Sequence, residues 1–151
     1  MNTLLPGATL GVLGGGQLGR MLVHEAQRMG YQTVVLDPDP TSPAGLVSHH
    51  HICADYTDAA ALTELTRRCD AVTTEFENVP AKTLEQLSAR LEVRPSAHAV
   101  AVAQDRIVEK RMILDCGLQT APFHAIFGPE DINQAPPGIF PSLLKTARLG
   151  Y

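Results

Sequence analysis

The amino-acid sequence predicts an α/β fold, in which a Rossmann-like, doubly wound parallel sheet is followed by the start of a second domain. Apolar stretches of strand length alternate with amphipathic stretches of helix length up to about residue 95. The Val34-Val35-Leu36 stretch has no polar alternation, which is typical of a parallel strand covered on both faces. The first predicted strand also runs directly into glycines 14–16 and then into a helix, as βαβ units commonly begin.

Each element is predicted from apolar periodicity and from residues that start or end helices. We expect strands at residues 9–13, 32–37, 51–53, 71–74 and 92–94. Gly30 is placed to end the first helix, Asp58 is a good N-cap for the second, and Pro80 fits the first turn of the third. Apolar residues recur at helical spacing in these helices at Leu18, Met21, Leu22, Ala26 and Met29, then Leu62, Leu65 and Cys69, then Ala81, Leu84, Leu87 and Leu91.

After residue 95 the pattern becomes helical and then changes again. Asp105 can cap a helix that Gly117 ends. The apolar positions of this helix are Val108, Met112 and Cys116. Residues 123–127 and 140–146 resemble strands of a new unit.

The change of pattern predicts a domain boundary near residues 95–104. We assign residues 1–101 to a first domain, and residues 102–151 to a linker helix and the beginning of a second domain. Two short strands cannot bury their faces alone, so we expect the second domain to be incomplete and the sequence to be the front part of a longer protein.

Composition argues against several classes of partner. The 151 residues carry a net charge of -4 and their basic residues are scattered, which argues against nucleic acid or an acidic membrane surface as partner. The apolar runs are too short to span a bilayer. Cys53, Cys69 and Cys116 contain no C-x-x-C pair, which indicates reduced thiols in the cytoplasm. We expect these cysteines to be small buried apolar residues.

The glycine-rich turn after the first strand predicts a phosphate site. Gly14, Gly16 and Gly19 match G-x-G-x-x-G, and the first backbone amides of the following helix have no partner within that helix. The partly positive end of a helix binds a phosphate without a side-chain cation. This pattern leaves a dinucleotide and another phosphorylated metabolite both open. Asp37 is at the right distance for the ribose of a dinucleotide, although Asp-Pro is also an ordinary loop start.

Two carboxylates follow the fourth predicted strand. Ligands of an open parallel sheet bind beyond the carboxyl ends of its strands, where the glycine turn also lies. Glu75 and Glu77 are two apart in a segment that we expect to be extended, so both side chains would project to one side and could hold sugar hydroxyls or an amine. In the run His49-His50-His51, by contrast, consecutive side chains point to alternate faces, which indicates polar side chains at the surface and not a metal site.

Several motifs, in this order, carry a resemblance to a known family. They are Gly14-Gly15-Gly16-Gln17-Leu18-Gly19-Arg20-Met21, Thr74-Glu75-Phe76-Glu77-Asn78-Val79-Pro80, Gln104-Asp105-Arg106 with Glu109-Lys110, Leu144-Lys145-Thr146, and Gly150-Tyr151. Together they resemble 5-(carboxyamino)imidazole ribonucleotide synthetase, the ATPase subunit of phosphoribosylaminoimidazole carboxylase, in the ATP-grasp superfamily. The resemblance spans almost the whole chain, and the joint pattern of the first two motifs favours a ligand other than a dinucleotide.

The resemblance implies that residues 1–101 are a substrate-binding pre-ATP-grasp domain and that residues 102–151 begin an ATP-grasp domain, in a cytoplasmic homodimer. Family members use ATP to carboxylate aminoimidazole ribonucleotide with bicarbonate, through carboxyphosphate, in purine biosynthesis. The products are the N-carboxylated ribonucleotide, ADP and phosphate. Because the activated intermediate is short-lived, the site must exclude water until the substrate amine attacks.

The resemblance also implies roles for particular residues. The phosphate and ribose of the ribonucleotide would bind at Gly15, Gly16, Gln17 and Leu18. Glu75 and Glu77 would face the sugar or the amine. ATP would contact Arg106, Lys145, Gly150 and Tyr151. Mg²⁺ ligands are expected beyond residue 151, so this piece alone should lack turnover, and no catalytic base is assigned.

Two other functions fit parts of the sequence. The glycine signature and Asp37 favour an NAD(P)-binding oxidoreductase domain, which NADH would stabilise against heat. A non-catalytic nucleotide-sensing domain would fit a gene that ends near Tyr151, since such a protein has no catalytic metal site.

Overall fold

The computed structural model describes residues 3–149 of the chain. Contacts within the chain divide it into two compact units, Met1–Ala101 and Val102–Tyr151. The strands found in the described residues all belong to the first unit. No helix within residues 3–149 has both the length and the apolar character that a membrane crossing requires.

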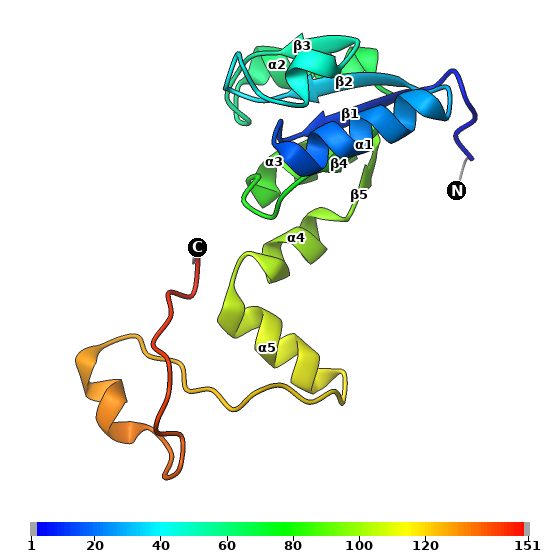
Figure 1. Cartoon of the computed structure of the whole chain (residues 1–151). Helices are drawn as coiled ribbons and strands as arrows, with labels where there is room; N and C mark the ends of the chain where they lie inside the picture. The colour runs from blue at the N-terminus through cyan, green and yellow to red at the C-terminus, as the bar shows by residue number, and fades with distance from the viewer. Residues whose placement is uncertain (1–2, 150–151) are drawn as a thin grey trace. The chain divides into compact units, whose positions relative to one another are not determined.

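The first unit is built on a five-stranded parallel sheet with the strand order β3-β2-β1-β4-β5 (Figure 1). The strands are β1 (Thr9–Leu13), β2 (Gln32–Leu36), β3 (His50–Ile52), β4 (Ala71–Thr74) and β5 (Glu92–Arg94). Helix α1 (Gln17–Arg28) covers one face, and α2 (Ala59–Arg68) and α3 (Ala81–Ser88) cover the other. The predicted doubly wound α/β fold is confirmed.

Consecutive residues of the central strands point into two separate cores. Leu13 and Leu36 pack with residues of α2 and α3, whereas Val12 and Val35 pack with Val23 of α1. Both faces of β1 and β2 are therefore buried. This two-sided burial is the physical reason why β2 is apolar at consecutive positions.

The register of the sheet brings the ends of three strands to one edge. Leu13 of β1 pairs with Leu36 of β2 and with Thr74 of β4, so these strands end side by side. The residues that follow them in the chain are Gly14, Asp37 and Glu75. Three segments far apart in the sequence therefore meet at the carboxyl edge, where ligands of parallel sheets bind.

Helix α1 faces the sheet with a different set of residues from the one that periodicity suggests. Of the five apolar residues at helical spacing, only Ala26 is buried, and Leu18 is 65% exposed. The buried positions are Gly19, Val23 and Ala26. A β-carbon on Gly19 would lie 2.8 Å from the carbonyl oxygen of Gly14, so the helix approaches the turn closely through small residues. Close packing of the small residues leaves the larger ones outside.

The second unit begins within α4 (Ala97–Ala103) and continues into α5 (Arg106–Asp115). Asp105 caps α5 as predicted, because its Oδ1 accepts hydrogen bonds from the backbone N–H groups of Ile107 at 3.0 Å and Val108 at 3.2 Å. Gly117 follows the helix with a φ of +76°, a left-handed conformation that suits glycine.

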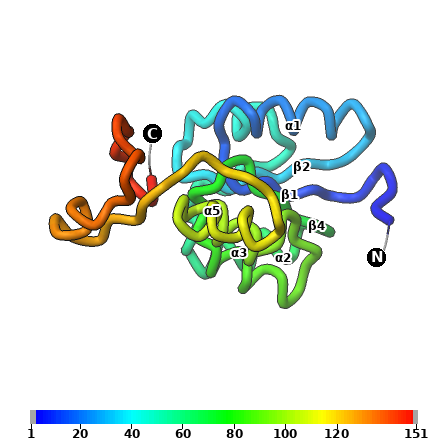
Figure 2. The backbone as a smooth tube through the Cα atoms, turned by 90° about the horizontal axis from the view of Figure 1, so that it is seen from below, coloured from blue at the N-terminus to red at the C-terminus, as the bar shows by residue number. Residues whose placement is uncertain are grey.

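Residues 123–127 and 140–146 do not form strands, so that prediction is wrong. Beyond α5 the chain follows an irregular course, interrupted by the 3-10 helix η2 (Pro129–Gln134) (Figure 2). A strand needs a neighbour for its backbone hydrogen bonds, and the described residues of the second unit form no strand that could pair. The apolar side chains consequently stay exposed, as for Phe127 at 79% and Leu144 at 80%.

The expectation that all three cysteines are buried is correct only for Cys69. Cys69 directly follows α2 and packs in the main core. Cys53 and Cys116 are exposed. Cys53 lies just past the edge strand β3, and Cys116 ends the exposed helix α5, so neither is enclosed by two layers.

Candidate functional site at the carboxyl edge of the sheet

The turn between β1 and α1 packs against the side chain of Glu75. A β-carbon on Gly14 would lie 2.7 Å from Glu75 Oε2, and one on Gly16 would lie 2.5 Å from Glu75 Oε1. Gly14 also has a φ of +102°, which disfavours any other residue. Glycines at these positions therefore let the carboxylate rest directly on the turn.

The N-terminus of α1 offers backbone donors beside that carboxylate. Gly16 is the N-cap and makes no side-chain cap, and Arg20 is the first residue here whose N–H bonds back to Gly16. The amides of Gln17 and Leu18 thus belong to the first turn, which has no partner within the helix, and both residues are exposed. The edge carries an anion-binding helix end and, next to it, a hydrogen-bond acceptor with negative charge.

Asp37 is engaged in holding this turn. Its Oδ2 accepts the N–H of Gly15 at 2.7 Å and the hydroxyl of Tyr56 at 2.8 Å, and its Oδ1 accepts the N–H of Asp39 at 2.8 Å. The residue is 9% exposed. A carboxylate that already accepts three hydrogen bonds is poorly placed to take the two ribose hydroxyls of a dinucleotide.

Tyr56, which the sequence reasoning missed, joins several parts of the edge. Besides its bond to Asp37, its ring lies 5.9 Å from that of Phe76, and its carbonyl oxygen accepts the hydroxyl of Thr83 at 3.0 Å. Burial, and then the hydrogen bond to Asp37, raise the pKa of Tyr56 far above its usual range, so the hydroxyl remains a donor. A tyrosine between Asp55 and Thr57 gives no periodic signal that predicts such a contact.

The segment that carries Glu75 and Glu77 forms a turn and does not continue strand β4 in an extended conformation. Strand β4 ends at Thr74, whose hydroxyl donates to the carbonyl oxygen of Phe76 at 2.8 Å, and residues 75–79 form bends and a turn. The expectation that this segment is extended is therefore wrong, and the reason given for placing Glu75 and Glu77 on one side does not hold. The early turn brings Glu75 onto the glycines.

The three consecutive histidines contact three different partners. His49 Nδ1 accepts from the N–H of Thr33 at 3.1 Å, His50 Nε2 lies 2.9 Å from a carboxylate oxygen of Glu64, and His51 Nε2 lies 3.1 Å from the carbonyl oxygen of Asp37. Within residues 3–149 no group of three or more histidine, cysteine, aspartate or glutamate side chains is arranged to hold a metal ion.

In the second unit, the structure brings together the chain segments that contain Arg106 and Lys145. The backbone N–H of Arg106 donates to the carbonyl oxygen of Ala147 at 2.9 Å, and Arg148 Nε lies 3.2 Å from Asp105 Oδ2. Both predicted cations are exposed. Lys145 is not in a strand, contrary to expectation. The predicted contacts at Gly150 and Tyr151 lie outside the described residues.

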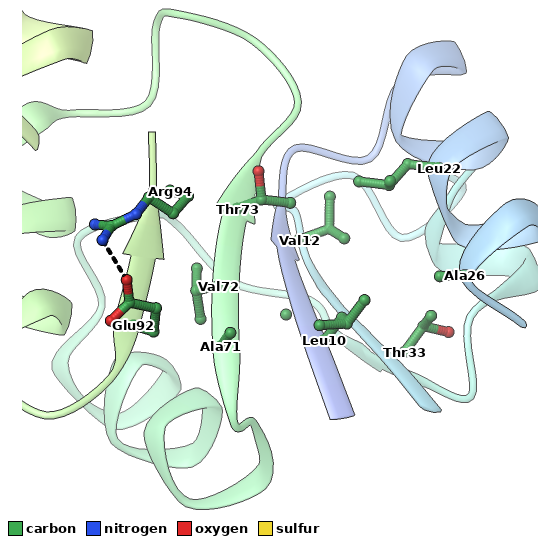
Figure 3. A pocket seen from close by; sticks show the side chains of 11 residues that line it. Leu10, Val12, Leu22, Ala26, Thr33, Ala71, Val72, Thr73, Glu92 and Arg94 are labelled. Atoms are coloured by element: carbon green, nitrogen blue, oxygen red, sulfur yellow. Dashed lines mark ion pairs between the residues drawn. The ribbon is translucent and has the colours of Figure 1, made fainter. Parts of the chain in front are cut away.

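An apolar hollow of about 280 Å³ lies elsewhere on the sheet, over β1 and β4 between α1 and β5 (Figure 3). Leu10, Val12 and Leu22 line it, and an ion pair between Glu92 and Arg94 stands at its β5 side. None of the predicted site residues lines this hollow. The exposed N-terminus of α1 and the Glu75 carboxylate lie instead at the carboxyl edge.

Comparisons with known proteins identify the family of the chain. Residues 7–104 match the family model of the ribonucleotide synthetase preATP-grasp domain. The N5-carboxyaminoimidazole ribonucleotide synthase of Staphylococcus aureus (strain COL) is 40% identical over 151 residues, which cover 99% of this chain and 40% of that protein. The chain thus spans about two fifths of the length of the curated relatives it matches.

The solved structures that resemble this chain are enzymes of the same family. The ADP complex of an N5-carboxyaminoimidazole ribonucleotide synthetase superposes with a TM-score of 0.92 at 38% identity, covering 98% of this chain and 40% of that one. The Aspergillus clavatus enzyme in complex with ADP and 5-aminoimidazole ribonucleotide gives a TM-score of 0.78 at 32% identity, covering 87% of this chain and 36% of that one. This chain belongs to the ribonucleotide synthetase pre-ATP-grasp family.

Proposed function

We propose that this chain provides the ribonucleotide-binding part of an ATP-dependent ligase that carboxylates 5-aminoimidazole ribonucleotide in purine biosynthesis. The observation that carries the proposal is the pairing of the free α1 N-terminus with the Glu75 carboxylate on one glycine turn. The solved structure of the Aspergillus clavatus enzyme, in complex with ADP and this ribonucleotide, supports the choice of ligand.

The two halves of the edge match the two ends of such a substrate. A phosphate carries negative charge and suits the backbone donors of Gly16, Gln17 and Leu18. Gly15 belongs to the same turn and is kept as part of the proposed site, although its own N–H already donates to Asp37. Ribose hydroxyls and an amine are donors, and they suit the carboxylates of Glu75 and Glu77. A ligand with an anion at one end and hydrogen-bond donors at the other would use both the backbone donors and the carboxylates.

We extend the proposal to the second unit as an ATP-binding part. Arg106 and Lys145 are exposed cations whose segments are linked through the bond from Arg106 to Ala147, which suits polyphosphate. Gly150 and Tyr151 complete the proposed ATP contacts. When bound, ATP supplies the phosphoryl group that activates bicarbonate. Residues 3–149 contain no group of three or more histidine, cysteine, aspartate or glutamate side chains that could hold a metal ion. We therefore expect the ligands of the accompanying Mg²⁺ outside such a group. A cytoplasmic homodimer is part of the same proposal, on the family resemblance alone.

A thermal-shift measurement separates this function from the oxidoreductase alternative. A saturating ligand stabilises the folded state, so 5-aminoimidazole ribonucleotide should raise the Tm of the chain by about 5 °C or more. NADH should leave the Tm unchanged, because Asp37 is occupied by Gly15, Tyr56 and Asp39. A rise with NADH and none with the ribonucleotide would refute the proposal.

A further inference from the structure

We infer that Tyr56 is a positioning residue that holds the glycine turn and the acidic segment after β4 at a fixed spacing, and thereby sets the affinity for the ribonucleotide. The inference rests on the proposed function for the identity of the ligand. Tyr56 itself need not touch that ligand. It contacts Phe76 of the acidic segment directly, and it reaches the glycine turn through Asp37.

The hydroxyl of Tyr56 acts on the glycine turn through one intermediary. It donates at 2.8 Å to the same Asp37 oxygen that accepts the N–H of Gly15 at 2.7 Å. A carboxylate oxygen with two donors has a defined direction for each, so the position of the Gly15 amide depends on the hydroxyl. Gly15 directly precedes the N-cap of α1, and a shift there moves the proposed phosphate donors.

The ring of Tyr56 acts on the acidic segment. Its centroid lies 5.9 Å from that of Phe76 with the planes tilted by 58°, a favourable geometry for an aromatic pair. Phe76 stands between Glu75 and Glu77, so its ring restrains the turn that carries both carboxylates. Hydroxyl and ring belong to one rigid side chain, which therefore couples the two segments.

Tyr56 is well suited to position both segments because a hydrogen bond to α3 fixes its own backbone. Its carbonyl oxygen accepts the hydroxyl of Thr83, a residue of α3 that is only 2% exposed. A side chain fixed to a buried helix transmits position better than one on a free loop. The raised pKa of Tyr56 keeps the hydroxyl protonated across the working pH range, so the link to Asp37 does not switch off.

The test compares Tyr56→Phe, which removes the hydroxyl and keeps the ring, with Tyr56→Leu, which removes both. Tyr31→Phe is the matched control, because Tyr31 is also half-buried and its hydroxyl donates to a backbone carbonyl, that of Leu4, at 3.0 Å. Two quantities are measured on each variant: ribonucleotide affinity by calorimetry, and backbone amide shifts by NMR.

We expect Tyr56→Phe to weaken ribonucleotide binding about 5- to 20-fold and to shift the Gly15 amide, with the Phe76 region little changed. Tyr56→Leu should weaken binding further and shift both regions. Tyr31→Phe should stay within about twofold of the wild type. In a double-mutant cycle, Asp37→Asn and Tyr56→Phe should be non-additive, because the hydroxyl acts through Asp37. A general loss of packing would not produce this coupling.

The outcomes separate the two claims. Tyr56→Phe with wild-type affinity and an unmoved Gly15 amide would overturn the inference. A wild-type chain that fails to bind the ribonucleotide would refute the proposed function, and the amide shifts would still decide whether Tyr56 fixes the turn.

Discussion

The carboxylate of Glu75 rests on Gly16: a β-carbon on that glycine would lie 2.5 Å from Glu75 Oε1. Gly16 itself has a φ of -71°, which any residue can adopt. The glycine is therefore required for the close approach of the carboxylate and not for backbone conformation. A substitution of Gly16 therefore tests the contact with the carboxylate without straining the backbone.

Gly16→Ala should displace the Glu75 carboxylate and weaken ribonucleotide binding by about tenfold or more. Stability should fall by no more than about 1 kcal/mol, since the backbone is unstrained and Gly16 makes no side-chain cap. Calorimetric titration and chemical denaturation measure the two effects. In a Glu75→Ala background, which removes the obstacle, the same glycine replacement should change affinity little. An equal loss in both backgrounds would contradict this explanation.

Glu77→Ala and Arg106→Ala should affect different ligands in the full-length enzyme. The glutamate variant should raise the KM for the ribonucleotide by about tenfold and leave that for ATP nearly unchanged, because its carboxylate is proposed to face the sugar or the amine. The arginine variant should do the reverse, because its guanidinium is proposed to balance polyphosphate charge. Steady-state kinetics with each substrate varied in turn provide the comparison. Equal effects on both substrates would remove this division of roles.

Asp37→Ala should lower the free energy of unfolding by about 2–4 kcal/mol, because the Gly15 amide and the Tyr56 hydroxyl lose their buried acceptor. Asp39→Ala, two residues away, should cost less than about 1 kcal/mol, because the carboxylate of Asp39 is exposed. Urea denaturation of both variants gives the values. Similar losses for the two would mean that Asp37 does not organise the turn.

Acid should loosen the start of α5. The backbone N–H of Val108, then that of Ile107 and the guanidinium of Arg148, hold the pKa of Asp105 below its usual range. A lowered pKa in the folded state stabilises at pH values above the unfolded pKa, and this contribution is lost as the pH falls through the folded pKa. Amide exchange at residues 107 and 108 should therefore accelerate, relative to the intrinsic rate, as the pH falls below about 4, and it should change little between about pH 6 and about pH 4.

Asp105→Asn is the control for this pH effect, because asparagine caps a helix without titrating. Its protection at residues 107 and 108 should not depend on pH over the same range. If the wild type and this variant respond alike, the acid effect arises from another group.

The strands of the first unit were predictable because burial on both faces leaves uninterrupted apolar runs, as in Val34 and Val35. The carboxyl edge followed from parallel topology alone. The face of α1 was not predictable from size and spacing, because Gly19 allows a close approach that excludes Leu18 and Met21 from the core. Strand formation at residues 140–146 failed for another reason: a strand depends on a partner, and local sequence does not supply one.

The sequence by itself determined the alternation of elements, the capping of α5 by Asp105 and the family to which the chain belongs. Only the tertiary structure decided that Asp37 supports the glycine turn, that Tyr56 reaches it, and that Glu75 lies against the glycines. Periodicity reports which residues of one element share a face. The hydrogen bonds of Asp37 to Tyr56 and to Gly15 join residues that are 19 and 22 positions apart in the sequence. Such residues become neighbours only when the strands pair in their register.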